Sequence, residues 1–166
     1  MAETTIWRGN PSQWKNFGSF VLAAIITIAI VAASIFAARS ASAESRRLGP
    51  FILIFLLLPI FMALTRYLQT KNRIYELTSE RLKTCEGVFN RVTDTLELYR
   101  VKDLETRQPF LYRVVGIENV QLNTSDASSP VALISAIPSS VGLPDKIRNQ
   151  VEGIRAQKGV REIDVE

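Results

Sequence analysis

The chain has 166 residues, with 20 Lys or Arg against 16 Asp or Glu, a formal net charge of +4, one cysteine and no histidine. This length accommodates one domain of ordinary size plus a membrane anchor, but not two sizeable soluble cores. The composition excludes histidine-dependent nucleophiles, histidine-ligated metals, thiolate zinc sites and an intramolecular disulfide. Residues 1–65 carry a net charge of +3 and the rest of the chain only +1. The soluble part lacks the strongly basic face of nucleic-acid-binding domains, so we predict no nucleic-acid partner.

Two uncharged, apolar runs lie near the N-terminus, at residues 17–38 and 48–65. As a helix rising about 1.5 Å per residue, the first run spans about 33 Å, enough to cross a hydrocarbon core of about 30 Å. The second run is shorter, and Pro59 within it favours a kink. The prediction is a tail over residues 1–16, then a transmembrane hairpin over residues 17–68, with helices at 17–38 and 48–66 and a loop at 39–47.

Two other interpretations of these runs are weaker. Ala41-Ser42-Ala43 resembles a signal-peptide cleavage site, but the apolar stretch before it is longer than an ordinary signal-peptide core, and Arg39 separates the two. The runs could instead be buried helices of a soluble protein, but two uncharged runs of this length, back to back, disfavour that.

Charged residues around the hairpin predict its orientation. The loop carries three cations, and the outer ends of the two helices carry five: Arg8, Lys15, Arg66, Lys71 and Arg73. Since cytoplasmic segments are enriched in Lys and Arg, we expect both termini and the soluble domain in the cytoplasm.

Two sets of residues are candidates for contacts at and within the membrane. Aromatic and basic side chains at the helix ends suit the headgroup region, namely Trp14, Lys15, Arg66, Tyr67, Lys71 and Arg73. A specific lipid switch carries about four to eight clustered cations, so generic flanking charge is the alternative for the three at the second helix exit. Small residues that permit close helix packing are Ala23, Ala24, Ala32, Ala33 and Ser34.

From about Tyr75 the pattern changes to short alternating runs with β-branched residues. The prediction is a mostly β domain over residues 70–158, followed by a tail at 159–166. The expected strands cover residues 75–78, 81–89, 92–101, 120–124 and 131–137. The last of these is apolar on both faces and is therefore predicted to be central and buried.

Two helices are expected in this domain. Pro109 suits a helix start and Gly116 a helix end, which predicts a short helix over residues 108–116 with one broad apolar face. A final helix opened by Pro144 carries Ile147, Val151 and Ile154 as an apolar stripe. Because no long helices alternate with the strands, we expect an antiparallel β-barrel or sandwich capped by this C-terminal helix.

No residue pattern predicts catalysis, a metal site or a cofactor. Nothing in the sequence brings Asp94, Asp103 and Asp126 together, and Cys85 has no histidine to act as its base. A candidate partner-binding surface consists of Arg100, Lys102, Arg107 and Arg113. Acidic residues are interspersed among these cations, so an ordinary solvated surface is the alternative.

The order of motifs resembles the bacterial pleckstrin-homology-like (PH) domain family, in its membrane-anchored form with two N-terminal transmembrane helices. The resemblance rests on Tyr75-Glu76-Leu77-Thr78-Ser79-Glu80-Arg81-Leu82, on the run from Leu96 to Leu104, on residues 108–116, and on Trp7-Arg8-Gly9-Asn10-Pro11-Ser12 before the first helix. Glu118 departs from the family pattern, which often has a second glycine after Gly116. The resemblance implies an α+β chain, with a two-helix hairpin followed by a PH-like antiparallel barrel or sandwich and a capping helix, in the bacterial inner membrane.

Three functions follow as hypotheses. The first is a non-enzymatic, membrane-tethered interaction or scaffold module whose β domain binds a protein or peptide, for example through a strand edge. The second is an accessory subunit of a larger membrane assembly, in which the hairpin packs against other subunits or another copy. The third and weakest is a membrane enzyme. Expected partners are membrane lipids and protein subunits, including self-association.

Overall fold

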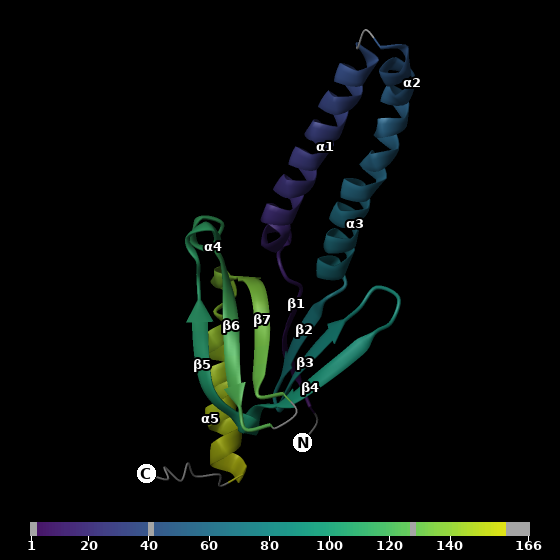
Figure 1. Ribbon diagram of the computed structural model, residues 1–166. Helices are drawn as coiled ribbons and strands as arrows, with labels where there is room; N and C mark the ends of the chain where they lie inside the picture. Colours follow the sequence, from purple (N-terminus) through teal and green to yellow (C-terminus); the bar gives the residue numbers. More distant parts are fainter. Residues whose placement is uncertain (1–2, 40–41, 127–128, 159–166) are drawn as a thin grey trace. The chain divides into compact units, whose positions relative to one another are not determined.

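The computed structural model describes residues 3–39, 42–126 and 129–158, and these form two compact units. One unit, residues 16–68, is helical and is called the hairpin below. The other, residues 1–15 together with 69–166, is called the β domain. Figure 1 shows the elements of both in sequence colours. The predicted tail at residues 159–166 and the loop positions 40–41 lie outside the described residues.

The hairpin consists of α1 (Phe17–Ala38) and a second helical stretch made of α2 (Ala43–Ile52), η2 (Leu53–Leu56) and α3 (Leu57–Lys71). Both stretches are long and apolar enough to cross a membrane. The first matches the predicted bounds. The second begins five residues before the predicted start and ends five residues after the predicted end. Apolarity marks only the part suited to hydrocarbon, whereas polar turns continue the helix at both ends.

The second stretch tightens to a 3-10 conformation over η2 for an identifiable reason. Pro59 has no amide hydrogen, so the carbonyl of Phe55, four residues earlier, loses its α-helical partner. Local tightening to a 3-10 turn gives such carbonyls a different partner. The irregularity predicted at Pro59 therefore occurs in the turn that precedes it.

The β domain contains two antiparallel sheets. The first has the order β1-β2-β3-β4 and the second β5-β6-β7. The strands are β1 (Thr5–Gly9), β2 (Ile74–Thr78), β3 (Arg81–Glu86), β4 (Val92–Glu97), β5 (Val101–Arg107), β6 (Ile117–Thr124) and β7 (Val131–Pro138). The PH-like antiparallel architecture expected from the sequence is confirmed.

Residues 1–16 are not merely a tail, because β1 pairs with β2 along the first sheet, with Gly9 opposite Tyr75. The hairpin is thus inserted between two neighbouring strands. The Trp-Arg-Gly-Asn-Pro-Ser run has local reasons: Trp7 packs against the core, and a Cβ on Gly9 would collide with the Trp7 ring. The amide of Ser12 donates to the carbonyl of Ala136, 2.8 Å away, which joins this segment to β7.

The predicted strand over residues 92–101 is divided between the two sheets. The 3-10 turn η3 (Leu98–Arg100) forms the corner, and Leu98 is completely buried there, with its amide bonded to the carbonyl of Glu80 at 3.0 Å. Leu96, Leu98 and Val101 all face the core, so the apolar alternation shifts by one residue between Leu98 and Val101. The prediction of one continuous strand missed this shift, which coincides with the change of sheet.

The strand at 131–137 was predicted to be central, and that prediction is wrong, because β7 is an edge strand and β6 is central. Val131 and Leu133 are 52% and 53% exposed. Ile134 and Ile137 both face the core because β7 has one extra residue between them relative to β6, a β-bulge at which Ala136 has φ 55°. Residues 134–137 are all buried, Ser135 and Ala136 included, so the predicted burial of both faces holds for the second half of β7, whereas its first half is an exposed edge.

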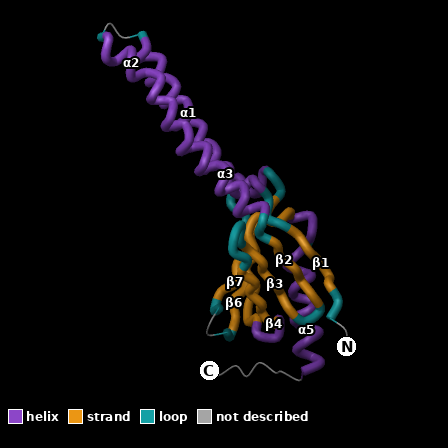
Figure 2. Tube along the Cα trace, turned by 90° about the vertical axis from the view of Figure 1, so that its right-hand side faces the viewer, coloured by secondary structure: helices purple, strands orange, loops and turns teal. Residues whose placement is uncertain are grey.

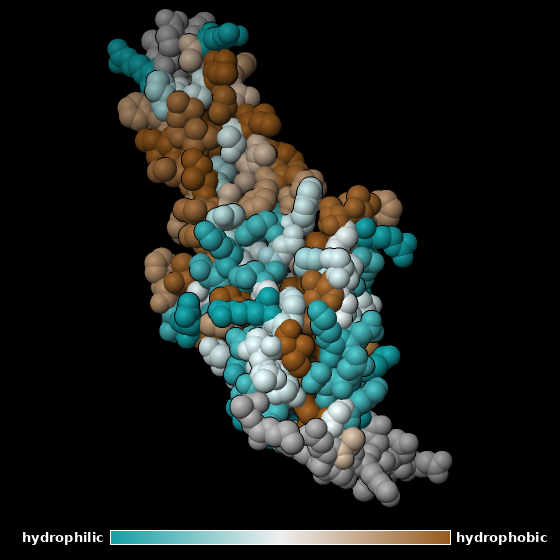
Figure 3. Space-filling view, turned by 180° about the vertical axis from the view of Figure 1, so that it is seen from behind, coloured by the Kyte–Doolittle hydropathy of each residue, from teal (hydrophilic) through white to brown (hydrophobic). Residues whose placement is uncertain are grey.

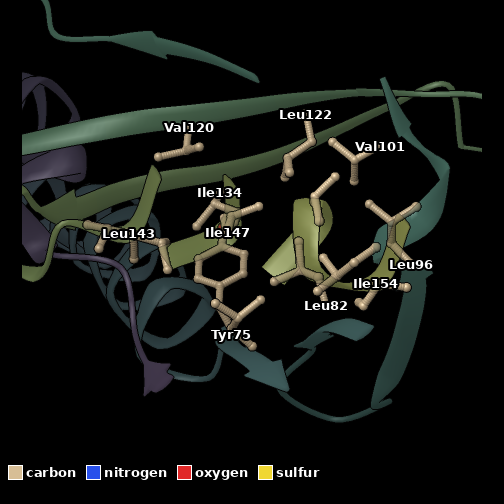
Figure 4. Packing of buried hydrophobic residues seen from close by; sticks show 14 residues of the cluster. Tyr75, Leu82, Leu96, Val101, Val120, Leu122, Ile134, Leu143, Ile147 and Ile154 are labelled. Carbon is tan, nitrogen blue, oxygen red and sulfur yellow. The ribbon is translucent and has the colours of Figure 1, made fainter. Parts of the chain in front are cut away.

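The core fills the space between the sheets and one side of α5 (Leu143–Lys158). Figure 4 shows strand and helix side chains converging there. The predicted stripe of the last helix is buried, and Leu143 extends it by one turn. In Figure 2, α5 lies beside the strands as a single purple helix. The C-terminal capping helix is therefore confirmed.

Candidate functional site

A groove of about 350 Å³ lies between β3 and β4 of one sheet and the first half of β7 of the other. It exists because β4 and β7 are both edge strands, at the ends of different sheets. Its lining is Arg73, Leu82, Thr84, Glu86, Asp94, Thr95, Leu96, Asp126, Ser129, Val131, Ala132 and Leu133. The groove therefore has a strand edge on either side, which is the feature that main-chain recognition of an extended peptide requires.

The two walls of the groove differ in chemistry. On the β7 side, Val131 and Leu133 are more than half exposed and give an apolar wall. On the β3–β4 side, Leu82 and Leu96 belong to the core. Thr84 and Asp94 lie further along the same two strands, in the part that the second sheet does not cover. The groove is thus apolar along one wall and polar along the other.

Charges in the groove are predominantly negative. Arg73 forms an ion pair with Glu86, and Asp126 accepts a hydrogen bond from Nη1 of Arg100 at 2.9 Å. Asp94 is exposed and makes no ion pair within residues 3–39, 42–126 and 129–158. Because the other two carboxylates have cationic partners, Asp94 is the group that would attract a positive side chain into the groove.

The four cations predicted to form one binding surface are not brought together. Arg100 and Lys102 lie at the start of β5, whereas Arg107 ends that strand and Arg113 follows in α4 (Phe110–Val114). Seven strand residues span about 20 Å, so these are two separate pairs. Arg107 also forms a two-point ion pair with Glu105, at 2.7 and 3.1 Å.

Arg100 is held by its neighbours rather than presented to a ligand. Its Nε donates to the hydroxyl oxygen of Tyr99 at 3.2 Å, and its guanidinium lies 5.7 Å from that ring's centroid. Tyr99, first, and then Asp126 raise the pKa of Arg100. Arg100 thus contacts the β6–β7 connection through Asp126, and its partner-binding role stays a prediction.

Asparagine side chains tie together the segments that lead into and out of the hairpin. In the β domain, Nδ2 of Asn10 donates to the carbonyls of Lys71 and Arg73, at 3.0 and 2.9 Å. Within the hairpin, Nδ2 of the buried Asn16 donates to the carbonyl of Arg66 at 3.2 Å. Asn10 belongs to the motif that carries the family resemblance, but neither asparagine was predicted to make these contacts, because polar tails carry many such residues without a long-range partner.

The predicted membrane-interface residues have different surroundings. Trp14, Arg66, Tyr67 and Lys71 are exposed. Lys15 instead donates from Nζ to the hydroxyl of Ser135 at 2.9 Å. Arg73 belongs to the groove through Glu86, as described above. The headgroup role of these six residues stays a prediction.

The predicted small-residue set in α1 is divided between buried and exposed positions. Ala23 and Ser34 are buried, and Oγ of Ser34 donates to the carbonyl of Gly49 at 2.8 Å, so Ser34 packs within the hairpin itself. A Cβ on Gly49 would lie 3.2 Å from the backbone nitrogen of Ala38, which shows how closely the helices approach. Ala24, Ala32 and Ala33 face outward and are exposed. Only the outward group is available to other helices.

No metal centre is present in the parts of the chain that the structure describes: they contain no group of three His, Cys, Asp or Glu side chains placed to hold an ion. Asp94 and Asp126 do line the same groove, although nothing in the sequence indicated this, while Asp103 is exposed on β5. Cys85 is half-buried in β3.

Comparison with known proteins places the chain in a family. The sequence profile of the bacterial PH domain family matches residues 16–154, which is most of the chain. A solved structure, the N-terminal PH domain of Vps36, is similar at 23% identity and a TM-score of 0.40, and covers 54% of this chain and 68% of that one. None of the curated proteins compared with the chain matches it. On the strength of the profile match and of the ordered motifs that span both units, the chain belongs to the bacterial PH domain family.

Proposed function

We propose that this chain is a non-enzymatic, membrane-tethered interaction module. The hairpin anchors it in the bacterial cytoplasmic membrane with both termini and the β domain in the cytoplasm, and the β4–β7 groove binds an extended segment of a partner protein. The single observation that supports this most is the groove itself, in which two strand edges face one space. A bound strand adds main-chain hydrogen bonds to an edge, and the wall side chains select its residues.

The groove's chemistry narrows the kind of segment it would take. Val131 and Leu133 offer an apolar wall to alternate side chains of an extended segment, since these lie on one face of a strand. Asp94 offers a negative charge to the opposite side of that segment. The favoured partner is therefore an extended segment that alternates apolar residues with Lys or Arg.

The test uses the full chain in lipid nanodiscs and a displayed library of random linear peptides as the probe. Selected peptides should contain a basic residue, and their binding, followed by fluorescence anisotropy, should weaken at least about tenfold in Leu133→Asp and in Asp94→Lys, since burying an unpaired or repelled charge costs more than about 1.4 kcal/mol. The control is Lys102→Glu, which is exposed on β5 outside the groove.

The control also distinguishes binding in the groove from binding to the basic surface predicted from the sequence, which includes Lys102. If Lys102→Glu weakens binding and the two groove variants do not, the site is the basic surface on β5, and the groove has no role. If all three bind the selected peptides equally, neither surface recognises them.

An accessory-subunit function is the second candidate, and one observation favours it: the adjacent residues Ala32 and Ala33 of α1 are exposed and would let another helix approach closely. The native particle, extracted in mild detergent, would then contain other membrane proteins at a fixed ratio. Ala33→Leu should release them while leaving peptide binding in the groove unchanged. A particle made of this chain alone contradicts that candidate.

A further inference from the structure

Two exposed apolar tips project from the β domain. The β3–β4 tip, residues 87–91, carries Val88 and the fully exposed Phe89. The α4 tip, Phe110–Val114, has no buried residue, and Phe110 is 77% exposed. Leu111 and Val114 are exposed there as well. The sequence indicated that this short helix would have an apolar face, but the structure leaves that face uncovered by the β domain.

The β3–β4 tip has a defined shape. Gly87 has φ 124°, and a Cβ at this position would collide with the carbonyl oxygen of Asn90, so the turn closes tightly on itself. The turn thereby holds Phe89 outward and away from the core. An exposed phenylalanine presented in this way costs free energy in water, which points to a surface that covers it.

The β3–β4 tip lies at the end of the β domain where the chain returns from the hairpin. Ile74, the first residue of β2, pairs with Cys85 near the end of β3, and Arg73 forms its ion pair with Glu86, directly before the tip. Gln69 and Asn90 line one shallow pocket at this place. The re-entry point and the tip are therefore neighbours within the β domain.

The α4 tip lies at the same end. The amide of Ser139 donates to the carbonyl of Gly116, directly after α4, at 2.9 Å. Three residues before Ser139, the carbonyl of Ala136 accepts the amide of Ser12, close to where the chain leaves for the hairpin. Figure 1 shows α4 and the β3–β4 turn at one end of the β domain and the β2–β3 turn at the other.

Cations accompany both tips. Arg91 ends the β3–β4 tip and Arg113 lies within α4, and both side chains are exposed. Neither forms an ion pair with any residue in the described ranges. Apolar side chains flanked by free cations suit a surface with an apolar interior and anionic headgroups. The view in Figure 3 shows brown apolar groups interrupting the otherwise mostly teal surface of the β domain.

We propose that the β3–β4 tip and the α4 tip insert into the headgroup region of the bilayer that holds the hairpin, with Arg91 and Arg113 on anionic lipid. This rests on the proposed membrane tether, which brings the lipid surface to this end of the domain at high effective concentration. Two insertion points and the hairpin connection hold the domain in one orientation. The groove would then face a fixed direction relative to the membrane.

The test uses the full chain, with Cys85→Ser, in vesicles of phosphatidylcholine and phosphatidylglycerol. Single cysteines placed by Phe89→Cys or Leu111→Cys carry an environment-sensitive fluorophore. Because both side chains are exposed, the labels leave the core intact. Glu80→Cys, in the exposed β2–β3 turn, is the matched control at the opposite end, and Ile60→Cys in α3 reports on the hairpin.

The proposal expects blue-shifted emission at positions 89 and 111, quenched by lipids brominated on their acyl chains, and water-like, unquenched emission at 80. Quenching at 60 with water-like emission at 89 and 111 overturns tip insertion and leaves the tether intact. Blue-shifted but unquenched emission at the tips also overturns it, because a protein surface such as a second copy then covers them. Absence of quenching at position 60 overturns both the tether and the insertion.

Discussion

In the hairpin, large side chains such as Ile28 and Phe61 face outward, whereas in the β domain Leu77 and Leu122 are completely buried between the sheets. Both regions are rich in apolar residues, but only the second hides them within its own unit. The brown surface of the helices and the mostly teal surface of the β domain in Figure 3 show this contrast. A helix that is apolar on every face needs an apolar surrounding, and a half-apolar strand needs only another layer of protein.

Core truncation should affect the two regions most unequally. Leu122→Ala removes a completely buried side chain from β6 and should lower the free energy of unfolding by about 2–5 kcal/mol, the lost transfer free energy plus the cavity that remains. Ile28→Ala, at a position 68% exposed in α1, should leave the unfolding of the β domain unchanged. Urea unfolding in mild detergent, followed by circular dichroism, measures both. Equal losses would mean that the hairpin and the domain unfold as one unit.

A buried charge should affect the regions in the opposite order. Ile28→Arg places a cation near the middle of α1 and should disfavour insertion by about 2.5–3.5 kcal/mol. The fraction of chain that resists alkaline extraction from membranes should therefore fall. Leu133→Arg, on the exposed wall of β7, is the matched control and should leave that fraction unchanged. If Ile28→Arg is extracted no more readily than the control, α1 does not sit in hydrocarbon.

Sequence patterns predicted some features of the hairpin and the β domain correctly and missed others. Uninterrupted apolarity indicated α1 directly, and the stripe through Ile147 indicated α5. Features that depend on distant partners were missed: β1 pairs with a strand that follows the hairpin in the sequence, and η3 changes sheet where the apolar alternation shifts by one residue after Leu98. The bulge at Ala136 was likewise missed, because an apolar run does not show where a strand carries an extra residue.

The candidate site was harder to predict than the fold, and for a physical reason. The groove combines Asp94, in β4, with Leu133, in β7. These strands belong to different sheets, so only the packing of the two sheets places their residues around one groove. Local patterns such as a run of cations are visible in a sequence, yet Arg100 and Arg107 turned out to lie at opposite ends of β5 and to be paired with acids. Residues that are close in sequence can therefore lie far apart along an extended strand and belong to different surfaces.

Asn10 tests how strongly the N-terminal segment is held within the β domain. Asn10→Ala removes two hydrogen bonds to backbone carbonyls and should lower the free energy of unfolding of the β domain by about 1–3 kcal/mol, since each such bond contributes about 0.5–1.5 kcal/mol. Asn90→Ala, in an exposed turn, is the control and should cost little. Urea midpoints compare them directly. The same midpoint for both variants would show that β1 alone, without this tie, holds the N-terminal segment in place.

The smallest effect concerns Glu118, whose carboxyl is half-buried on β6. Burial, first, and then the charge of Asp145 raise its pKa above the ordinary value. A raised folded-state pKa gives stability that is present below the unfolded-state value of about 4.3 and is lost as pH rises through the folded-state value. Glu118→Gln should therefore stabilise the β domain at neutral pH, by less than about 1 kcal/mol because water screens the charge, and this gain should vanish near pH ~4.

Urea unfolding at the two pH values measures this, with Glu152→Gln on the exposed face of α5 as a control that should change stability at neither. A gain from Glu118→Gln that persists at low pH would have a different cause, because protonated glutamate and glutamine carry the same charge. A loss at neutral pH would mean that the carboxylate accepts a hydrogen bond that glutamine cannot replace. The result decides whether the carboxylate at position 118, where the family often has glycine, costs stability or contributes to it.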